Sequence, residues 1–572
     1  MPEFMMTDQL ARLRRQRTAS LILELDLTEG ITEEPPADPL SAVLTMRRSR
    51  LADLLDGLRR ARGDRRVKAL VAKVGGRPIG LATVQEIRRA VEEFRDAGKL
   101  TVAWAETFGE FSAGNVPYFL ATAFETIYLQ PSGDLGLTGI AMERIFLRGT
   151  LDQLGIDFQV AKRHEYKSAA EQLTERSFSG PAREATERLA ESITAQLTDA
   201  IADRRRIGGD EVRQLIDQGP FLAAQALEHG LVDELGYRDE VYARVRKHTG
   251  ADAIAVHLGR YQRSRALGER VRKLPTPSPR HVALVYATGP IRRGRSGRGP
   301  FSGGAMGSDT ISAALRAATA DDGARAIVLR VNSPGGSYVA SDTIWREVVR
   351  ARNTGKPVVV SMGDVAASGG YFISMAADAI VAQPGTVTGS IGVLSGKPDL
   401  SQLLGRAGVT TDSVAEGAHS EMFKPTRPWS EDEWALVNGW LDHIYADFTG
   451  KVAEGRRMPA DRVHELARGR VWTGADALAN GLVDELGGLD RAAAIARRRA
   501  GLPASAPLRI YPRTGPLDRL RSSGSADARP AAALLPGSAL LAEAWGPVWR
   551  LASQAGLSPY GPLTLQGSWI FE

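Results

Sequence analysis

The 572-residue sequence contains no cysteine. It can therefore form neither a disulfide framework nor a thiolate metal site, and it offers no thiol nucleophile. It also lacks the run of roughly 18 to 20 apolar residues that a membrane-spanning helix requires. The nearest approach, residues 531–549, is interrupted by Pro536, Glu543 and Pro547. Without a span or a signal peptide, a cytoplasmic or peripheral membrane location is expected.

Positive charge is in only slight excess, and the net charge is +6. The surplus is concentrated in three basic segments, 12–17, 260–280 and 291–299, which we place at the periphery of the folded parts. We interpret these segments as solvated arms and linkers, and we expect no nucleic-acid partner. The alternative is a weak attraction to an anionic membrane surface.

The chain contains an internal duplication. The heptapeptide Gly-Leu-Val-Asp-Glu-Leu-Gly occurs at 230–236 and again at 481–487. A tandem pair of similar domains is therefore predicted, with less patterned segments around and between them. The predicted limits are a basic N-terminal arm at 1–17, a first repeat at 18–250, a basic linker at 251–280, a second repeat at 281–515 and a C-terminal tail at 516–572.

The two repeats differ in length. Residues 67–74 match residues 324–331 at a spacing of 257, whereas Tyr118 matches Tyr371 at a spacing of 253. The first repeat therefore carries four extra residues between these two anchors.

Each repeat alternates short apolar runs with amphipathic stretches. In the second repeat, 281–286, 326–331 and 356–361 are β-branched, apolar runs of strand length, and 339–352 has helical periodicity. A further helix is predicted at 371–377. Buried strands that alternate with helices predict an α/β fold with a mostly parallel sheet and flanking helices in each repeat. Such sheets carry their functional loops at the carboxyl ends of the strands.

Two glycine-rich loops follow predicted strands of the second repeat. One is Asn-Ser-Pro-Gly-Gly-Ser at 332–337, and the other contains Ala-Ala-Ser-Gly-Gly-Tyr at 366–371. A serine at a helix start is commonly only an N-cap. Small neighbours on both sides instead favour Ser368 as a nucleophile, and the backbone N–H groups of Gly335 and Gly369 could together hold a developing oxyanion.

A serine nucleophile needs a base, and histidine is scarce. None of the eight histidines lies in or beside the glycine-rich loops, and His164 and His419 are the nearest candidates. His164 opens the stretch His-Glu-Tyr-Lys-Ser-Ala-Ala-Glu, which sets Lys167 among small residues. A lysine acts as a base only if burial or a second cation lowers its pKa by roughly 3, at a cost of about 4 kcal/mol. Most lysines are solvated, so the residues alone do not select Lys167.

Taken together, these motifs resemble the signal peptide peptidase A (protease IV) family in its long, duplicated form. The resemblance covers nearly all of both repeats and is most specific at Tyr-Lys-Ser-Ala (166–169), Asn-Ser-Pro-Gly-Gly-Ser (332–337), Ser-Met-Gly-Asp-Val-Ala-Ala-Ser-Gly-Gly-Tyr (361–371) and Thr-Gly-Ser-Ile-Gly-Val (388–393). It implies a tandem duplication of a ClpP/crotonase-like domain and a serine endopeptidase whose Ser/Lys dyad is split between the repeats. The implied roles are Ser368 as nucleophile, Lys167 as general base, Ser390 as the residue that orients the lysine amine, and Gly335 and Gly369 as oxyanion-hole donors.

The same resemblance implies substrates and assembly. Members of the family degrade signal peptides left in the membrane after secretion, and they assemble into rings or bowls that admit only unfolded chains. We therefore expect hydrophobic peptide substrates, membrane association and a homo-oligomer, specifically a tetramer. The acyl-transfer mechanism needs no metal and no other cofactor. With lysine as the base, its rate should rise toward alkaline pH.

Comparing the repeats position by position supports one site per chain. The first repeat has Asn115 where the second has Ser368, and Pro78, which has no N–H to donate, where the second has Gly335. Near the position in the second repeat that corresponds to the proposed base, the closest lysine is Lys424, which is the alternative base. Two other functions remain open at this point: a crotonase-like acyl-CoA enzyme, and a catalytically idle scaffold that binds hydrophobic peptides.

Overall fold

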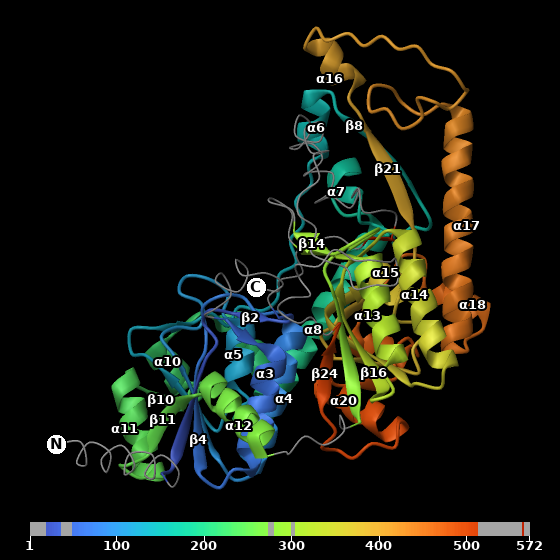
Figure 1. Ribbon diagram of the computed structural model, residues 1–572. Helices are drawn as coiled ribbons and strands as arrows, with labels where there is room; N and C mark the ends of the chain where they lie inside the picture. The colour runs from blue at the N-terminus through green and yellow to red at the C-terminus, as the bar shows by residue number, and fades with distance from the viewer. Residues whose placement is uncertain (1–18, 36–47, 273–279, 299–303, 513–562, 565–572) are drawn as a thin grey trace, which may run out of the picture. The chain divides into compact units, whose positions relative to one another are not determined.

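The computed structural model describes residues 19–35, 48–272, 280–298, 304–512 and 563–564 (Figure 1). The chain forms two compact units. Unit 1 comprises residues 1–141, 193–277 and 570–572, and unit 2 comprises residues 142–192 and 278–569. The predicted arm at 1–17 and, apart from 563–564, the predicted tail at 516–572 lie outside the described residues.

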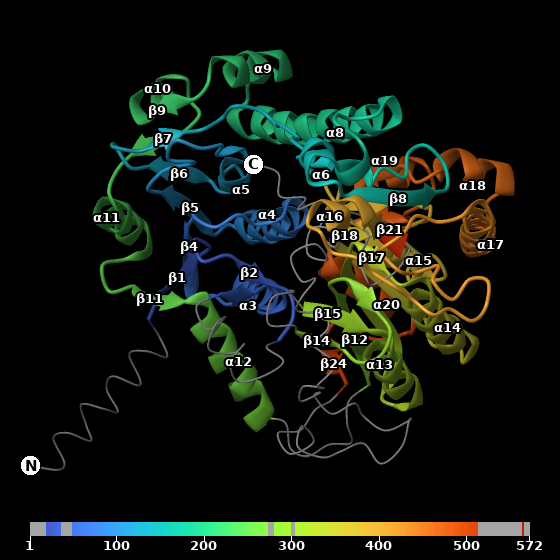
Figure 2. The same ribbon diagram turned by 90° about the horizontal axis from the view of Figure 1, so that it is seen from above.

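Unit 1 is built on a six-stranded parallel sheet of order β10-β6-β5-β4-β1-β11. Helices α3 and α4 lie on one side of this sheet and α11 on the other (Figure 2), which is why its strands are apolar on both faces. The sheet strands are β1 (Leu21–Asp26), β4 (Val67–Lys73), β5 (Leu100–Ala105), β6 (Thr126–Leu129), β10 (Glu234–Leu235) and β11 (Ile254–His257). The helices are α3 (Leu51–Gly63), α4 (Leu81–Asp96), α5 (Asn115–Ala121), α9 (Gly209–Gln218), α10 (Ala223–Glu228), α11 (Arg238–Thr249) and α12 (Leu258–Arg272).

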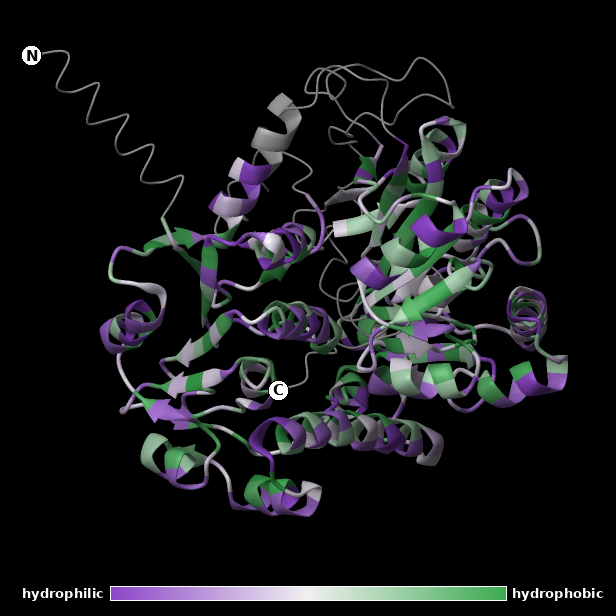
Figure 3. Ribbon diagram, turned by 90° about the horizontal axis from the view of Figure 1, so that it is seen from below, coloured by the Kyte–Doolittle hydropathy of each residue, from purple (hydrophilic) through white to green (hydrophobic). Residues whose placement is uncertain are grey.

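Unit 2 contains a larger sheet of main order β22-β20-β18-β16-β12-β24, to which β19 and β23 are added beside β18. Its pairs are parallel except for β20 with β22. The strands are largely hydrophobic (Figure 3) and form one apolar cluster with α13, α14 and α17. These strands are β12 (His281–Thr288), β16 (Ala324–Ser333), β18 (Val358–Ala367), β19 (Ala379–Ala382), β20 (Val387–Gly389), β22 (Val471–Thr473), β23 (Glu485–Leu486) and β24 (Leu508–Tyr511). The helices include α13 (Ser308–Ala320), α14 (Tyr338–Asn353), α17 (Glu431–Arg456), α18 (Ala460–Leu466), α19 (Gly474–Ala479) and α20 (Leu489–Arg499).

The predicted alternation of strands and helices in the second repeat is present, with one element wrong. β12, β16 and α14 cover the predicted runs and extend beyond them, whereas β18 begins two residues later than predicted, at Val358, and continues to Ala367. The helix predicted at 371–377 is instead α15 (Gly369–Phe372), followed by turns. The N–H groups of Ser374 and Ala377 donate to carbonyls three residues back, at 2.9 and 3.0 Å. These tight turns end the helix and direct the chain into β19.

One segment of the first repeat packs in unit 2. Residues 142–192 leave unit 1, and within them β8 (Asp157–Lys162) pairs antiparallel with β21 (Leu394–Asp399) of the second repeat. The two strands lie side by side in Figure 1, flanked by α6 (Arg148–Leu154), α7 (Glu171–Thr174), α16 (Ser401–Arg406) and α17. Lys167 lies five residues after the end of β8, so this excursion carries it into unit 2.

The segment predicted as a linker, 251–280, begins with regular structure in unit 1. β11 pairs with the edge strand β1, and Leu258 and Tyr261 of α12 are buried. Among the described residues, no helix combines the length and apolar character needed to cross a bilayer.

Candidate active site

Ser368 lies at a sharp turn directly after β18. Its backbone has φ 54° and ψ −115°, a conformation that is strained for a residue with a side chain. Its N–H donates to Gly389 O over 2.8 Å, which ties the turn to the end of β20. The side chain makes no capping hydrogen bond to α15. Ser368 therefore occupies the N-cap position of α15 without capping it through its side chain, and its hydroxyl is free to face another group.

That other group is the amine of Lys167. Lys167 Nζ lies 2.9 Å from Ser368 Oγ, 3.0 Å from Ser390 Oγ and 3.1 Å from Ser390 O. All three side chains are fully buried. A neutral amine can donate two hydrogens, one to each oxygen of Ser390, and its lone pair then accepts the hydroxyl proton of Ser368. The arrangement matches the geometry that a serine nucleophile and its general base require.

The electrostatics of the pocket favour the neutral amine. Burial lowers the pKa of Lys167 to about 7, and desolvation is the cause of the shift. A lysine with this pKa is about half deprotonated at neutral pH. The side chain can therefore act as a base under ordinary conditions.

One loop, between α18 and β22, holds the backbone on both sides of the Lys167 amine, at Tyr166 and at Ser390. Tyr166 N–H donates to Arg468 O over 3.2 Å, and Ser390 N–H donates to Arg470 O over 2.7 Å. Between these anchors, Gly469 has φ +87°, and a methyl group added there would lie 2.6 Å from Lys167 Cα. Sequence reasoning missed this loop because a glycine in a polar connection, far from both motifs, carries no signal of its own.

The predicted oxyanion glycines meet at the same place. A methyl group added at Gly369 would lie 3.0 Å from Gly335 Cα and 2.8 Å from Ser341 Oγ, so only glycine lets the two loops approach. The Gly335 N–H donates to Ser333 Oγ over 3.1 Å. Its use as an oxyanion donor therefore stays a prediction, and it requires this N–H to be shared with, or released from, Ser333.

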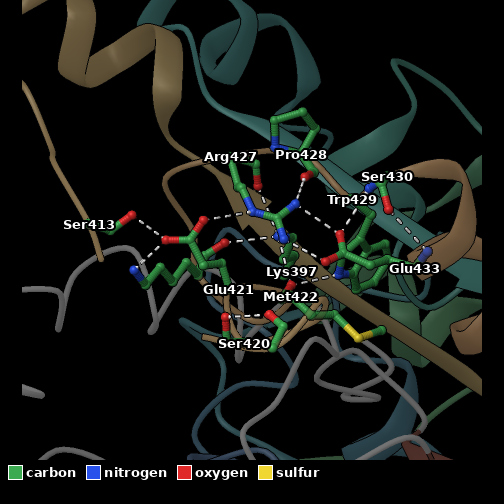
Figure 4. Close-up of polar contacts among 12 residues, drawn as sticks. Lys397, Ser413, Ser420, Glu421, Met422, Arg427, Pro428, Trp429, Ser430 and Glu433 are labelled. Carbon is green, nitrogen blue, oxygen red and sulfur yellow. Dashed lines mark hydrogen bonds and ion pairs between the residues drawn. The ribbon is translucent and has the colours of Figure 1, made fainter. Parts of the chain in front are cut away.

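The alternative base, Lys424, is elsewhere and is already paired. Its amine, with the side chain 45% exposed, donates to Glu421 over 2.7 Å. Glu421 also contacts Ser413 and Arg427 (Figure 4). The Lys424 carbonyl accepts a hydrogen bond from Lys397, whose amine also binds two neighbouring carbonyls. The residue belongs to a surface network that orders its own loop.

Neither histidine candidate serves as the base in the described structure. The ring of His164 lies tilted against Tyr445, with ring centres 4.5 Å apart, and edge-on to His464 at 4.9 Å, and His419 is exposed. His164 contributes instead through its backbone, because its carbonyl accepts from Lys167 N–H over 3.3 Å.

The corresponding position of the first repeat is structural. Asn115 Oδ1 accepts from the N–H groups of Thr138 and Gly139, both at 3.1 Å, and its Nδ2 donates to Gly139 O over 2.8 Å. An amide in this role is satisfied on both sides and is not a nucleophile. Unit 1 therefore has no serine at the place where unit 2 has Ser368.

Comparison with known proteins identifies the family. The sequence model described as "Peptidase family S49" matches residues 93–252 and 350–503, and together these segments make up more than half of the chain. The chain belongs to peptidase family S49. It is a serine-type peptidase, and its resemblance to protease IV is confirmed by relatives along most of its length.

Three members of the family illustrate the similarity. The chain is 33% identical over 457 residues to "Serine protease SPPA, chloroplastic" of Arabidopsis thaliana, covering 79% of this chain and 66% of that one. It is 32% identical over 506 residues to "Protease 4" of Salmonella typhi, covering 85% and 79%. For "Protease 4" of Haemophilus influenzae the identity is 31% over 457 residues, covering 77% and 71%.

The expected fold class is also confirmed. Two S49 segments, one in each repeat, accompany a match of the "Clp protease" model to residues 305–385, so the duplicated α/β domain is ClpP-like. A solved structure of a ClpP1 mutant from Listeria monocytogenes is 16% identical, with a TM-score of 0.23, and the match covers 36% of this chain and 91% of that one.

Proposed function

We propose that this S49 peptidase is an endopeptidase in which Ser368 is the nucleophile, neutral Lys167 the general base and Ser390 the residue that orients the amine. The observation that carries the proposal is the 2.9 Å separation of Lys167 Nζ and Ser368 Oγ in a fully buried pocket. Lys167 takes the hydroxyl proton as Ser368 attacks the peptide carbonyl, and it then protonates the leaving amine. Water hydrolyses the resulting ester with the same base.

The tetrahedral intermediate needs donors for its oxyanion. We assign this role to the N–H groups of Gly369 and Gly335, which lie on the two loops that meet beside Ser368. The positive end of a helix of four residues adds little, so the local N–H groups carry the stabilisation.

The substrates we propose are extended hydrophobic peptides such as cleaved signal peptides. Beside the nucleophile, Gly335 and Gly336 form strand β17, which pairs antiparallel with residues 563–564. An edge that pairs with an extended segment suits the backbone of a peptide substrate, because main-chain hydrogen bonds supply affinity without regard to sequence. The family resemblance adds the preference for hydrophobic chains. It also supports a homo-oligomer, which light scattering of the purified protein can measure.

A cleavage assay on signal-peptide mimics tests the proposal. Wild type should cleave, Ser368→Ala and Lys167→Ala should lose at least about a thousandfold in kcat/KM, and Lys424→Ala should behave like wild type. A serine-directed phosphonate should label wild type at Ser368 and fail to label Lys167→Ala. Cleavage that survives Ser368→Ala, or copurifying coenzyme A, would instead favour the crotonase-like alternative.

A further inference from the structure

Unit 1 contains a cavity of about 350 Å³ that takes no part in the site described above. Its floor is formed by buried aliphatic side chains, which are Leu27, Val74, Val84, Val116 and Leu120. A volume of this size is in the range of ligand pockets and can hold a large apolar side chain. The cavity therefore offers a place where an apolar group gains by leaving water.

The cavity occupies the functional edge of the unit 1 sheet. Its walls come from the segments that directly follow β1, β4 and β5, at the carboxyl ends of parallel strands. By the internal duplication, the segments after β4 and β5 correspond to those after β16 and β18, which carry Gly335 and Ser368 in unit 2. Unit 1 thus retains a pocket where unit 2 has its candidate active site.

The chemistry of that site is absent from this pocket. Asn115 stands where the nucleophile would be, and both the oxygen and the nitrogen of its amide bond backbone groups. Pro78, which lines the cavity, stands at the position of the oxyanion glycine and has no N–H. A ligand in this cavity can be bound but not cleaved.

The mouth of the cavity carries the residues that distinguish the first repeat. The four extra residues fall between Gly98 and Tyr118, in the stretch that includes the lining residues Glu110 and Ser112. Between these two, Phe111 is fully exposed at φ 53°, and its N–H donates to Asp134 over 3.4 Å. A lone exposed phenylalanine needs no explanation, but beside an apolar cavity it extends the apolar surface outward.

Two charges of opposite sign lie on the same rim. Arg77 and Glu110 line the cavity, and neither forms an ion pair within the described part of the chain. Opposite charges around an apolar floor suit a polypeptide, whose backbone and flanking side chains present both donors and acceptors.

We propose that this cavity, lined by its apolar floor and by Arg77 and Glu110, with the exposed Phe111 next to Glu110 in the chain, is a noncatalytic subsite that binds an apolar side chain of an extended polypeptide. The identity of that polypeptide as the substrate rests on the proposed function. The subsite holds a hydrophobic chain without cutting it, while unit 2 supplies the chemistry.

The absence of cysteine permits a direct test of occupancy. A single cysteine at Ser112→Cys, an exposed lining position, is labelled with an environment-sensitive fluorophore in the full chain with Ser368→Ala and titrated with a lysine-flanked leucine–alanine peptide. We expect a saturable blue shift. Filling the cavity with Ala113→Trp should weaken the apparent affinity about tenfold or more, the loss expected for one buried apolar contact. The same label at Val414→Cys, a fully exposed position in unit 2, should show no shift.

A second variant guards against misfolding of the filled cavity. Phe111→Ser changes only an exposed side chain and should also weaken the titration, with thermal unfolding unchanged. If no saturable shift occurs at Ser112→Cys, or if both variants titrate like the parent, the subsite is refuted.

Cleavage of the same peptide by wild type is measured separately. If wild type cleaves the peptide but the labelled variant shows no fluorescence shift, the subsite is contradicted and the peptidase proposal still stands. A saturable shift that both variants weaken, without cleavage by wild type, supports the subsite and contradicts the peptidase proposal.

Discussion

At the scale of single residues, the burial of Lys167 costs stability, and we propose that the buried amine acts as the general base. A fall of the lysine pKa from 10.5 to about 7 corresponds to a cost on the order of 5 kcal/mol. Burial causes this cost, and among the described residues the amine is compensated only by hydrogen bonds to Ser368 and Ser390. A group retained at such a cost points to function rather than to stability.

The pH dependence of cleavage should report the titration of Lys167. Because only the neutral amine can accept the Ser368 proton, kcat/KM should fall about tenfold per pH unit below pH 7 and level off above about pH 8. The profile is measured on a peptide without ionisable side chains. Lys424→Ala should leave it unchanged, and a flat profile between pH of about 6 and 9 would contradict the role of Lys167.

Stability should show the same titration with a defined sign. The folded-state pKa of Lys167 lies below its unfolded value, so the unfolded chain binds an extra proton between pH of about 7 and 10.5. In that window the free energy of unfolding gains up to about 1.4 kcal/mol per pH unit from this residue. Urea denaturation of Lys167→Met at pH 7, 8 and 9 should show a shallower rise than wild type by that amount. The exposed Lys424→Met should keep the wild-type slope.

At the scale of elements, two connections determine the geometry of the site. The turn from β18 into α15 presents Ser368, and the loop between α18 and β22 presses against Lys167 through Gly469. Both depend on backbone conformations with positive φ. Small changes there should alter catalysis more than folding.

Gly469→Ala should separate activity from stability. The added methyl group overlaps the Lys167 backbone at a residue whose φ is +87°, so the amine should shift away from Ser368. Since misplacement by about 1 Å can reduce rate by about a hundredfold, we expect a loss of kcat of that order. Gly405→Ala is the matched control, because nothing lies within 4 Å of the added group. Equal kcat in the two variants would show that the loop does not position Lys167.

Residues 563–564 should compete with a peptide substrate for pairing with β17. Residues 563–564 pair with Gly335 and Gly336, where the proposed peptide substrate would add its own strand. Removing residues 563–572 should therefore lower KM for a peptide by roughly a few-fold and leave kcat unchanged, because an internal competitor reduces apparent affinity. Steady-state kinetics measure this, and an unchanged or raised KM would mean that substrate does not use this edge.

At the scale of the whole molecule, the site exists only when distant parts of the chain fold together. Lys167 and Ser368 are separated by 201 residues, and the segment that carries the lysine is held by the β8–β21 pairing. Arg163 strengthens this attachment, because its guanidinium bonds the Asn438 carbonyl over 2.7 Å and pairs with Asp442 of α17. Neither repeat contains both members of the proposed dyad.

Arg163→Ala should weaken that attachment. We expect kcat to fall about tenfold, as the loss of roughly 1.4 kcal/mol of positioning energy would produce, while both units stay folded by circular dichroism. Arg176→Ala is the matched control, because its partner Asp152 lies in the same excursion. If both variants retain wild-type kcat, the Arg163 contacts do not position the base.

The sequence by itself determined the duplication, the parallel α/β class and the glycine-rich turn that carries Ser368, since repeats, periodicity and turn chemistry are local properties. The same local reasoning predicted a helix to residue 377, whereas α15 ends at Phe372 because the following turns connect it to β19. It also selected Lys167 over Lys424 only through a family resemblance. Only the tertiary structure separates the surroundings of the two lysines: one is fully buried beside Ser368, and the other pairs with Glu421 at the surface. Burial, and the pKa that follows from it, depends on contacts between residues hundreds of positions apart, which no local pattern records.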